Sequence, residues 1–317
     1  MKNFISVEDV EQPAALVEQA RLLKQQPLAY HHLGRHKTLG LLFFNASLRT
    51  RMSTEVAARN LGMEVMVLNM NSDTWKLEFN DGVVMNADRQ EHIREAAAVV
   101  SQYCQVLGIR SFPSLTDRQA DYAEQIVKSF VKYATVPVIS LESATLHPLQ
   151  SLADWLTIEE HKPVERPKVV LSWAPHPKAL PQAVANSFLQ WLKLAPVELV
   201  LAHPPGYELA PQFSAGVATT HNQQEALAGA HFVYVKNWSS YRDYGQVLQV
   251  GEDWRIDEEK MSLTDRGYFM HCLPVRRNVV VTDEVLDGQR SLVIAQAENR
   301  IYAAQAVLKT ILTNADT

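Results

Sequence analysis

The stretch TLGLLFFNASLRTRMSTEVAARNLGM, residues 38–63, joins a short apolar run to a helical pattern through a polar turn. Its first seven residues are typical of a buried β-strand, and the residues after Arg51 have the spacing of a helix. Ser47 lies at or near the expected helix N-cap, where free backbone N–H groups and the helix dipole attract an anion. Arg49 and Thr50 add charged and hydroxyl donors at the same turn. Two interpretations are open: an anion site, or an ordinary helix cap with solvated arginines.

Apolar runs of similar length recur along the chain, separated by helix-like segments. The first half holds TLGLLFF (38–44), EVMVLN (64–69), CQVLGIR (104–110) and VPVISLE (136–142). The second half holds KVVLSWA (168–174), ELVLAHP (198–204), FVYVKN (232–237), YFMHCLP (268–274) and SLVIAQA (291–297). Apolar strands that alternate with helices predict parallel sheets covered on both faces. We therefore expect an α/β protein with two doubly wound parallel-sheet domains.

The boundary between these domains is expected near the middle of the chain. HPLQSLADWLTIEEHKP (147–163) has helical spacing, and charge and prolines interrupt the pattern in HKPVERPK (161–168). We assign residues 1–146 to the first domain and 147–297 to the second. An amphipathic helix at 298–317 is expected to pack back on the first domain. Because ligands bind beyond the carboxyl ends of parallel strands, we expect the active site in a cleft between the domains.

The composition is that of a mixed, mildly acidic chain. Of its 317 residues, 47% are hydrophobic and 21% are charged, and the formal net charge is −5. This balance argues against a general nucleic-acid or membrane-surface binder, so any anion site must be local. The two cysteines, Cys104 and Cys272, lie in apolar runs, which disfavours a disulfide framework or a cysteine-rich metal site. No segment approaches the ~20 apolar residues of a membrane span, and we expect a cytoplasmic soluble protein.

Polar side chains also follow the other strands of the first domain. Arg110 ends the third apolar run, and His147 and Gln150 come three residues apart after the fourth, on one side of the next helix. A lone histidine there is commonly a structural hydrogen-bonding group. Several such side chains at one sheet edge, together with Ser47 and Arg49, instead favour a binding site.

The second domain places cations at its strand ends. His176 and Lys178 follow one strand, Lys236 ends another, and HCLPVRR (271–277) follows a third. The last stretch is either a buried strand stopped by proline with two solvated arginines, or one wall of a cation-rich cleft.

Three motifs, SLRTR (47–51), HPLQ (147–150) and HCLPVR (271–276), occur in this order and resemble the transcarbamylase (aspartate/ornithine carbamoyltransferase) family. The resemblance covers essentially the whole chain. It implies that the first domain binds carbamoyl phosphate and the second binds the amino acceptor. It implies no metal and no organic cofactor.

The resemblance also implies roles for individual residues. The residues implied to bind carbamoyl phosphate are Ser47, Leu48, Arg49, Thr50, Trp75, Arg110, His147, Gln150 and Arg300. Those implied to bind the acceptor are Gln90, Glu142, His176, Lys236, Cys272, Leu273 and Arg276. Those implied to act in catalysis are Arg49, Thr50, His147 and Cys272. Cys272 and Leu273 are implied to orient the attacking amine through their main-chain carbonyls. Cations and hydroxyl donors suit this reaction because charge develops on the carbonyl oxygen and the departing phosphate.

The sequence KNWSS (236–240) indicates the acceptor. By the resemblance, it occupies the position at which ornithine transcarbamylases have the motif D-x-W-x-S-M-G, whose aspartate binds the free α-ammonium group. A lysine there would repel a free α-ammonium group, so an N-acylated ornithine, as used in arginine synthesis, fits better. In that branch of the family, the position before E-H carries glutamate in acetyl-specific members and proline in the succinyl type. This chain has Gln90, which departs from both but does not repel a second carboxylate. We favour N-succinylornithine and keep N-acetylornithine as the alternative.

The resemblance further implies a homotrimer in which a loop of one subunit completes the next subunit's site. The polar stretch 71–96 fits that loop, and its Trp75 either reaches the neighbouring subunit or packs within its own. Arg51 is expected to support the loop or a subunit contact. A non-catalytic anion-binding relative remains a rival function. A nicotinamide-dependent oxidoreductase is disfavoured because no G-x-G-x-x-G follows an apolar run.

Overall fold

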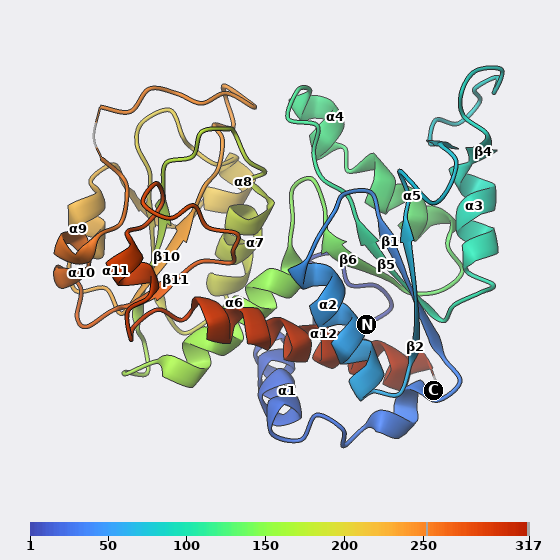
Figure 1. Ribbon diagram of the computed structural model, residues 1–317, viewed down its shortest axis with the longest axis horizontal. Coiled ribbons are helices and arrows are strands. Elements are labelled where there is room, and N and C mark those ends of the chain that lie inside the picture. The colour runs from blue at the N-terminus through green and yellow to red at the C-terminus, as the bar shows by residue number, and fades with distance from the viewer. Residues whose placement is uncertain (252, 316–317) are drawn as a thin grey trace. The chain divides into compact units, whose positions relative to one another are not determined.

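The computed structural model describes residues 1–251 and 253–315, and the chain forms two compact units, each built around a sheet (Figure 1). Unit 1 comprises residues 1–114, 119–149 and the chain from Arg300, and unit 2 comprises 115–118 and 150–299. The division falls within two helices, α6 (Pro148–His161) and α12 (Val293–Ala315). The boundaries at 146 and 297 stay predictions.

Unit 1 contains a parallel sheet with strand order β2-β1-β5-β6. The strands are β1 (Thr38–Phe43), β2 (Glu64–Asn69), β5 (Val106–Arg110) and β6 (Val138–Glu142). All four apolar runs predicted in the first half are therefore confirmed as strands. The chain winds outward in opposite directions from β1, with β2 on one side and β5 on the other. The switch point of this doubly wound sheet thus lies between β1 and β5, where ligands bind in such folds.

Helices cover both faces of the unit 1 sheet. The helical segments of this unit are η1 (Val7–Asp9), α1 (Pro13–Gln25), η2 (His31–Gly34), α2 (Arg49–Asn60), α3 (Ile93–Val100), α5 (Gln125–Tyr133) and the end of α12, together with α4 (Arg118–Tyr122), whose first residue falls in unit 2. Ile93 of α3 and Phe130 of α5 pack with Ile109 of β5 in one core cluster. Beside α2 runs α12 (Figure 1), and Asn60 donates a hydrogen bond of 3.1 Å to Gln305.

Two features of unit 1 differ from the expectation. Strand β2 is an edge strand, and its Met66 and Leu68 side chains are 44% and 37% exposed, so the sheet is only partly covered there by the described residues. The stretch predicted as a loop at 71–96 contains the short paired strands β3 (Leu77–Glu78) and β4 (Glu91–His92), and α3 begins before it ends.

Unit 2 contains a parallel sheet with strand order β11-β10-β7-β8-β9. The strands are β7 (Lys168–Trp173), β8 (Glu198–Ala202), β9 (Ala218–Thr220), β10 (Phe232–Lys236) and β11 (Tyr268–Met270). The other helices of this unit are α7 (Ala183–Leu192), α8 (Pro211–Ser214), α9 (Gln223–Leu227), α10 (Glu258–Ser262) and α11 (Asp283–Leu286). Here the switch point lies between β7 and β10. None of the described helices is long and apolar enough to cross a membrane.

The strand predicted at 291–297 is wrong, because α12 begins at Val293. A short apolar run does not distinguish a buried strand from a buried helix. The burial of Leu292, Gln296 and Asn299 follows helical spacing and continues beyond the run. The sheet instead gains β9, a short and largely exposed strand that lacks an apolar run.

Candidate active site

The carboxyl ends of β1 and β5, at the unit 1 switch point, lead directly to the predicted anion-binding residues. Helix α2 begins at Arg49 with Leu48 in the N-cap position, one residue later than the predicted Ser47 cap. The Ser47 hydroxyl oxygen nevertheless accepts a hydrogen bond of 3.2 Å from the Thr50 backbone N–H, so it caps the first turn. The helix cap is therefore confirmed, and the anion site stays a prediction.

The two arginines of this turn have different surroundings. Arg51 is exposed, and its Nε lies 3.1 Å from Glu55, one helical turn along α2. Arg49 is half-buried and has no hydrogen-bond or ion-pair partner among residues 1–251 and 253–315. Arg49 therefore offers a cation to an incoming anion, whereas Arg51 already has a carboxylate.

Thr50 joins two buried arginines from distant parts of the chain. Its hydroxyl oxygen accepts hydrogen bonds from Arg110 at 3.0 Å and from Arg300 at 2.6 Å. Arg110 ends β5 and Arg300 lies on α12, and the two side chains are 6% and 5% exposed. Three predicted residues separated by up to 250 positions are thus brought together in unit 1.

Glu142 and His147 complete this group. Glu142 Oε2 lies 2.7 Å from Arg110 Nη1 and 3.5 Å from His147 Nε2. Nη1 of Arg300 lies 3.4 Å from the same His147 nitrogen. The assignment of Glu142 to the acceptor, implied by the family resemblance, stays a prediction; in this structure its carboxylate contacts Arg110 and His147.

We call these six side chains the arginine cluster: Arg49, Thr50, Arg110, Glu142, His147 and Arg300. They include three guanidinium groups and one carboxylate. Charged hydrogen bonds to phosphate oxygens are strong, and arginine binds such oxygens in pairs. The cluster therefore suits a small phosphate-bearing ligand.

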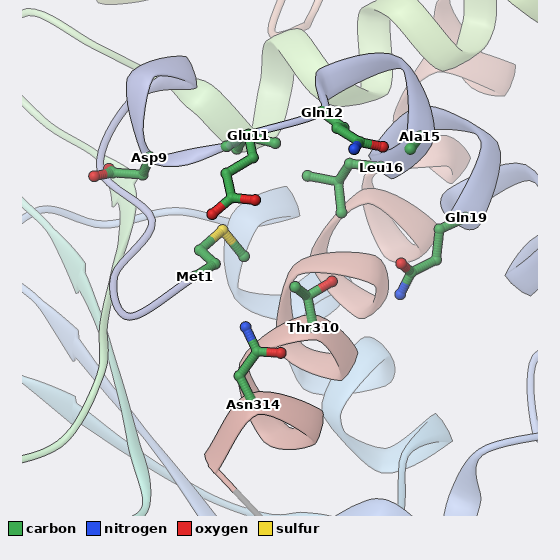
Figure 2. Close-up of a pocket in the computed structure, with 10 residues that line it drawn as sticks. Met1, Asp9, Glu11, Gln12, Ala15, Leu16, Gln19, Thr310 and Asn314 are labelled. Carbon is green, nitrogen blue, oxygen red and sulfur yellow. The ribbon is translucent and has the colours of Figure 1, made fainter. Parts of the chain in front are cut away.

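Two hollows in unit 1 are lined by side chains of different charge. One of about 290 Å³ lies at the start of α2, between Ser47, Arg51 and Asn69. Another of about 260 Å³ lies between the N-terminal segment and the end of α12 (Figure 2). The charged side chains lining the second are the acids Asp9 and Glu11, which do not suit an anion.

In unit 2, the switch point between β7 and β10 brings Lys236 and His176 to one edge. Lys236 ends β10 and is only 9% exposed. The next residue, Asn237, donates hydrogen bonds to the carbonyls of Ala174 at 3.0 Å and Pro175 at 2.8 Å. These bonds hold the segment that follows β7, and therefore His176, against the end of β10.

His176 is paired with Arg276, whose Nε donates a hydrogen bond of 3.0 Å to His176 Nε2. The other ring nitrogen, Nδ1, lies 2.7 Å from the Lys178 carbonyl oxygen and 3.1 Å from the Lys178 backbone nitrogen. The pKa of His176 is lowered from its usual value, first by burial, and also by the positive charges of Arg276, Lys236 and Lys178. We call Lys236 and Arg276 the acceptor cations; the neutral His176 ring accepts a hydrogen bond from Arg276 and lies within electrostatic reach of Lys236.

The HCLP segment follows β11 and has an unusual backbone. Leu273 has a φ of 57° and precedes a cis peptide bond to Pro274. Its N–H donates a hydrogen bond of 2.9 Å to His271 Nδ1. Cys272 is buried, and like Cys104 it is a free thiol. Burial raises the pKa of the Cys104 thiol to about 11.

Three predicted ligand residues are exposed. Leu48 and Trp75 are 68% and 53% exposed, and Trp75 Nε1 donates a hydrogen bond of 2.7 Å to Glu91. Gln90 is exposed, with its N–H bonded to the Lys76 carbonyl at 3.1 Å. In the described part of the chain, neither Trp75 nor Gln90 hydrogen-bonds to the arginine cluster.

The sequence prediction missed Asp154, which is fully buried on α6. Gln150 donates a hydrogen bond of 2.7 Å to its carboxylate. The signal was present, because Gln150 and Asp154 are four residues apart in a predicted helix and therefore face the same side.

Two known domain families match this chain, one in each half. The carbamoyl-P binding domain of aspartate/ornithine carbamoyltransferase matches residues 2–160, and the Asp/Orn binding domain matches residues 181–311. The chain therefore belongs to the aspartate/ornithine carbamoyltransferase family, and it is an enzyme of the transcarbamylase class.

Individual relatives are similar over nearly their whole length. The N-succinylornithine carbamoyltransferase of Bacteroides thetaiotaomicron is 48% identical over 314 residues, covering 98% of this chain and 99% of the relative. The N-acetylornithine carbamoyltransferase of Xanthomonas axonopodis pv. citri is 37% identical over 338 residues, covering 99% and 98%. A solved structure of an N-acetyl-L-ornithine transcarbamylase mutant, complexed with carbamyl phosphate and N-succinyl-L-norvaline, has a TM-score of 0.92 at 38% identity. That similarity covers 98% of this chain and 100% of the other.

Proposed function

We propose that the enzyme transfers the carbamoyl group of carbamoyl phosphate to the δ-amino group of N-succinyl-L-ornithine. The products are N-succinyl-L-citrulline and phosphate, a step of arginine biosynthesis in the cytoplasm. The observation that carries the choice of acceptor is the group of acceptor cations, in a chain 48% identical to an N-succinylornithine carbamoyltransferase.

Carbamoyl phosphate is proposed to bind at the arginine cluster. Arg110 and Arg300 are already oriented by the Thr50 hydroxyl, so little side-chain entropy is lost when the phosphate arrives. Arg49 supplies a further charge at the start of α2, where the helix dipole also favours an anion. Fixed donors of this kind stabilise charge on the carbonyl oxygen and the leaving phosphate without reorganisation.

The amine of the acceptor must be neutral when it attacks the carbonyl carbon. The new C–N bond forms as the C–O bond to phosphate breaks, and the departing phosphate takes the proton that the amine loses. We assign the main-chain carbonyls of Cys272 and Leu273 to orient that amine. The left-handed backbone at Leu273 supports a special role for this segment.

The acceptor cations match the charge of N-succinylornithine, which carries two carboxylates and no free α-ammonium. Lys236 and Arg276 attract both carboxylates, whereas they repel the α-ammonium group of ornithine. N-acetylornithine is the second candidate because it keeps one carboxylate, and relatives that act on it are 37% identical. Gln90 is proposed to decide between them, since its neutral amide tolerates a succinyl carboxylate.

We also propose a homotrimer in which Trp75 of one subunit reaches the next subunit's carbamoyl phosphate and Gln90 reaches that subunit's acceptor. Exposed apolar side chains on α2 and β2 support an oligomer: Met52, Val56, Met66 and Leu68. Light scattering on the eluting protein tests this, and a monomeric mass at assay concentration contradicts it.

Product identification tests the proposed reaction. The enzyme is incubated with carbamoyl phosphate and N-succinylornithine, and the product is examined by mass spectrometry. We expect the acceptor to gain one carbamoyl group in place of one proton, on the δ-nitrogen. Phosphate release without a carbamoylated acceptor contradicts the proposal.

A further inference from the structure

The side chain of Glu124 holds the turn that follows β6 in unit 1. Its Oε1 atom accepts hydrogen bonds from the backbone N–H and the hydroxyl of Thr145, at 2.7 and 2.5 Å, and one of 2.7 Å from the Ser143 hydroxyl. Its Oε2 atom accepts one of 3.3 Å from the Ala144 N–H. A carboxylate offers two acceptor oxygens and no donor, so it matches the donors of this turn. One side chain therefore fixes three consecutive residues.

The backbone of Glu124 lies in a conformation that side chains disfavour. Glu124 is the N-cap residue of α5, and its φ of 54° and ψ of 38° fall in the left-handed region. Glycine adopts this region most readily. Such a backbone persists where the surrounding structure stabilises it, and the four hydrogen bonds to the turn do so. The chain thus has a carboxylate at a position where the backbone alone favours glycine.

The turn held by Glu124 joins two members of the arginine cluster. Glu142 ends β6, and His147 directly precedes α6. Between them, the Ser143 N–H donates a hydrogen bond of 2.7 Å to the Leu146 carbonyl, and the Leu146 N–H donates one of 3.1 Å to the Ser143 hydroxyl. These bonds close the turn, whereas Glu124 ties it to the start of α5. All of these residues belong to unit 1.

The contacts of the His147 ring depend on the position of this turn. Its Nε2 atom lies 3.5 Å from Glu142 Oε2 and 3.4 Å from Arg300 Nη1, both longer than the usual hydrogen bond. A small outward shift of the turn would therefore take the ring out of reach of the cluster. Misplacement of a catalytic group by about 1 Å can cost roughly 100-fold in rate, even when the change lies away from the reacting atoms.

We propose that Glu124 is a positioning residue: by holding the turn 143–146, it sets the position of the His147 ring in the arginine cluster. This inference rests on the proposed function, because it takes His147 to contact the carbamoyl end of carbamoyl phosphate. Glu124 thereby contributes to recognition of the carbamoyl group, although it touches neither substrate.

The test compares the binding of phosphonoacetamide and methylphosphonate, which share the phosphonate, whereas only the first carries an amide carbonyl. Calorimetric binding to the wild-type protein should favour phosphonoacetamide by roughly 10- to 100-fold, because its carbonyl gains hydrogen bonds from the cluster. Glu124→Ala should reduce this preference to below about 3-fold and leave methylphosphonate binding nearly unchanged, since the arginines that meet the phosphonate stay in place. Equal binding of both ligands by the wild-type protein, or an unchanged preference in Glu124→Ala, overturns the inference.

Glu124→Gly separates the carboxylate from the strained backbone. The alanine and glycine variants both lack the carboxylate, but glycine adopts the left-handed conformation without strain. Glu124→Gly should therefore melt at a higher temperature than Glu124→Ala and show the same low preference, and it serves as the test if the alanine variant does not fold. A wild-type preference in Glu124→Gly would mean that the carboxylate does not position His147, and it overturns the inference.

His147→Ala determines whether Glu124 acts through the histidine. This variant alone should lose the preference for phosphonoacetamide. Combining it with Glu124→Gly should cause no further loss, because the two changes break the same chain of contacts. Additive losses in the double variant would show that Glu124 acts by another route and contradict the inference.

Asp9→Ala is the matched control for general stability in unit 1. The Asp9 carboxylate also holds a turn, accepting hydrogen bonds of 2.7 and 3.0 Å from the N–H groups of Ile5 and Ser6, but that turn leads to no cluster residue. The variant should lower the melting temperature and leave the preference unchanged. An equal loss in Asp9→Ala and Glu124→Ala would make the effect a general loss of structure and contradict the inference. Because these assays need no acceptor, failure to carbamoylate N-succinylornithine would overturn the proposed function alone.

Discussion

The two cation groups of this enzyme are built in opposite ways. In unit 1, Arg110 and Arg300 are buried and held by Thr50, so the arginine cluster is rigid before any ligand arrives. In unit 2, Arg276 is exposed and donates one hydrogen bond to a nitrogen of His176. The difference matches the proposed ligands. Carbamoyl phosphate is common to the family, whereas the acceptor differs among its members. We propose that the fixed group binds the shared substrate and that the exposed Arg276 contributes to binding the variable one.

The largest expected effect comes from removing the accessible cation of the arginine cluster. Arg49→Ala should lower turnover by roughly 10²- to 10³-fold, the usual cost of one preorganised donor to developing charge. Because Arg49 has no partner within the described residues, the melting temperature should change little. Steady-state kinetics and a thermal melt measure both.

Arg51→Ala is the matched control, two residues along the same helix. It breaks only the exposed pair with Glu55, which is worth about 0.3–0.5 kcal/mol. If it reduced turnover as much as Arg49→Ala, the two arginines would not have separate roles.

A smaller effect on activity is expected from removing Arg276, the exposed member of the acceptor cations. Arg276→Ala should raise KM for N-succinylornithine roughly 10- to 100-fold, because a charged hydrogen bond to a carboxylate is lost. KM for carbamoyl phosphate should hardly change. Arg277→Ala is the control, since Arg277 is paired with Asp283 and Asp287 at 2.7 Å. A similar loss in both variants would contradict the assignment of Arg276.

The pH dependence tests the histidine that supports Arg276. His176 has a lowered pKa, so it is neutral at pH 7, and the hydrogen bond from Arg276 is present there. Protonation occurs only as the pH falls below about 6.5, and it breaks that bond. KM for N-succinylornithine should therefore rise on the acid side, and His176→Asn should remove this dependence. If KM in His176→Asn still rises at low pH as in the wild-type enzyme, another group is responsible for the pH dependence.

The smallest effect is expected at Gln90. Gln90→Glu should shift the ratio of kcat/KM values toward N-acetylornithine by a few-fold, because exposed charges interact by roughly 0.2–1 kcal/mol. The shift should shrink as salt is added. Gln102→Glu, which adds the same charge elsewhere on the exposed surface of unit 1, should leave the ratio unchanged. No shift at Gln90 would mean that this loop does not select the acceptor.

Much of the fold followed from local pattern, whereas most pairings in the site did not. Eight apolar runs became strands because parallel strands buried on both faces need such runs. The strand prediction for 291–297 was wrong because a run of that length fits a strand or a helix equally well. The Gln150–Asp154 bond was predictable from helical spacing. The pair formed by His176 and Arg276, 100 residues apart, depends on packing that no local pattern encodes.

The central claim is that the enzyme selects an N-acylated ornithine with a second carboxylate. Phosphate release from carbamoyl phosphate, measured with N-succinylornithine, N-acetylornithine and ornithine in parallel, tests it most directly. We predict the highest kcat/KM with the succinyl compound, a lower value with the acetyl compound and negligible release with ornithine. A higher value with N-acetylornithine would contradict the acceptor assignment, and release with none of the three would support a non-catalytic anion-binding relative.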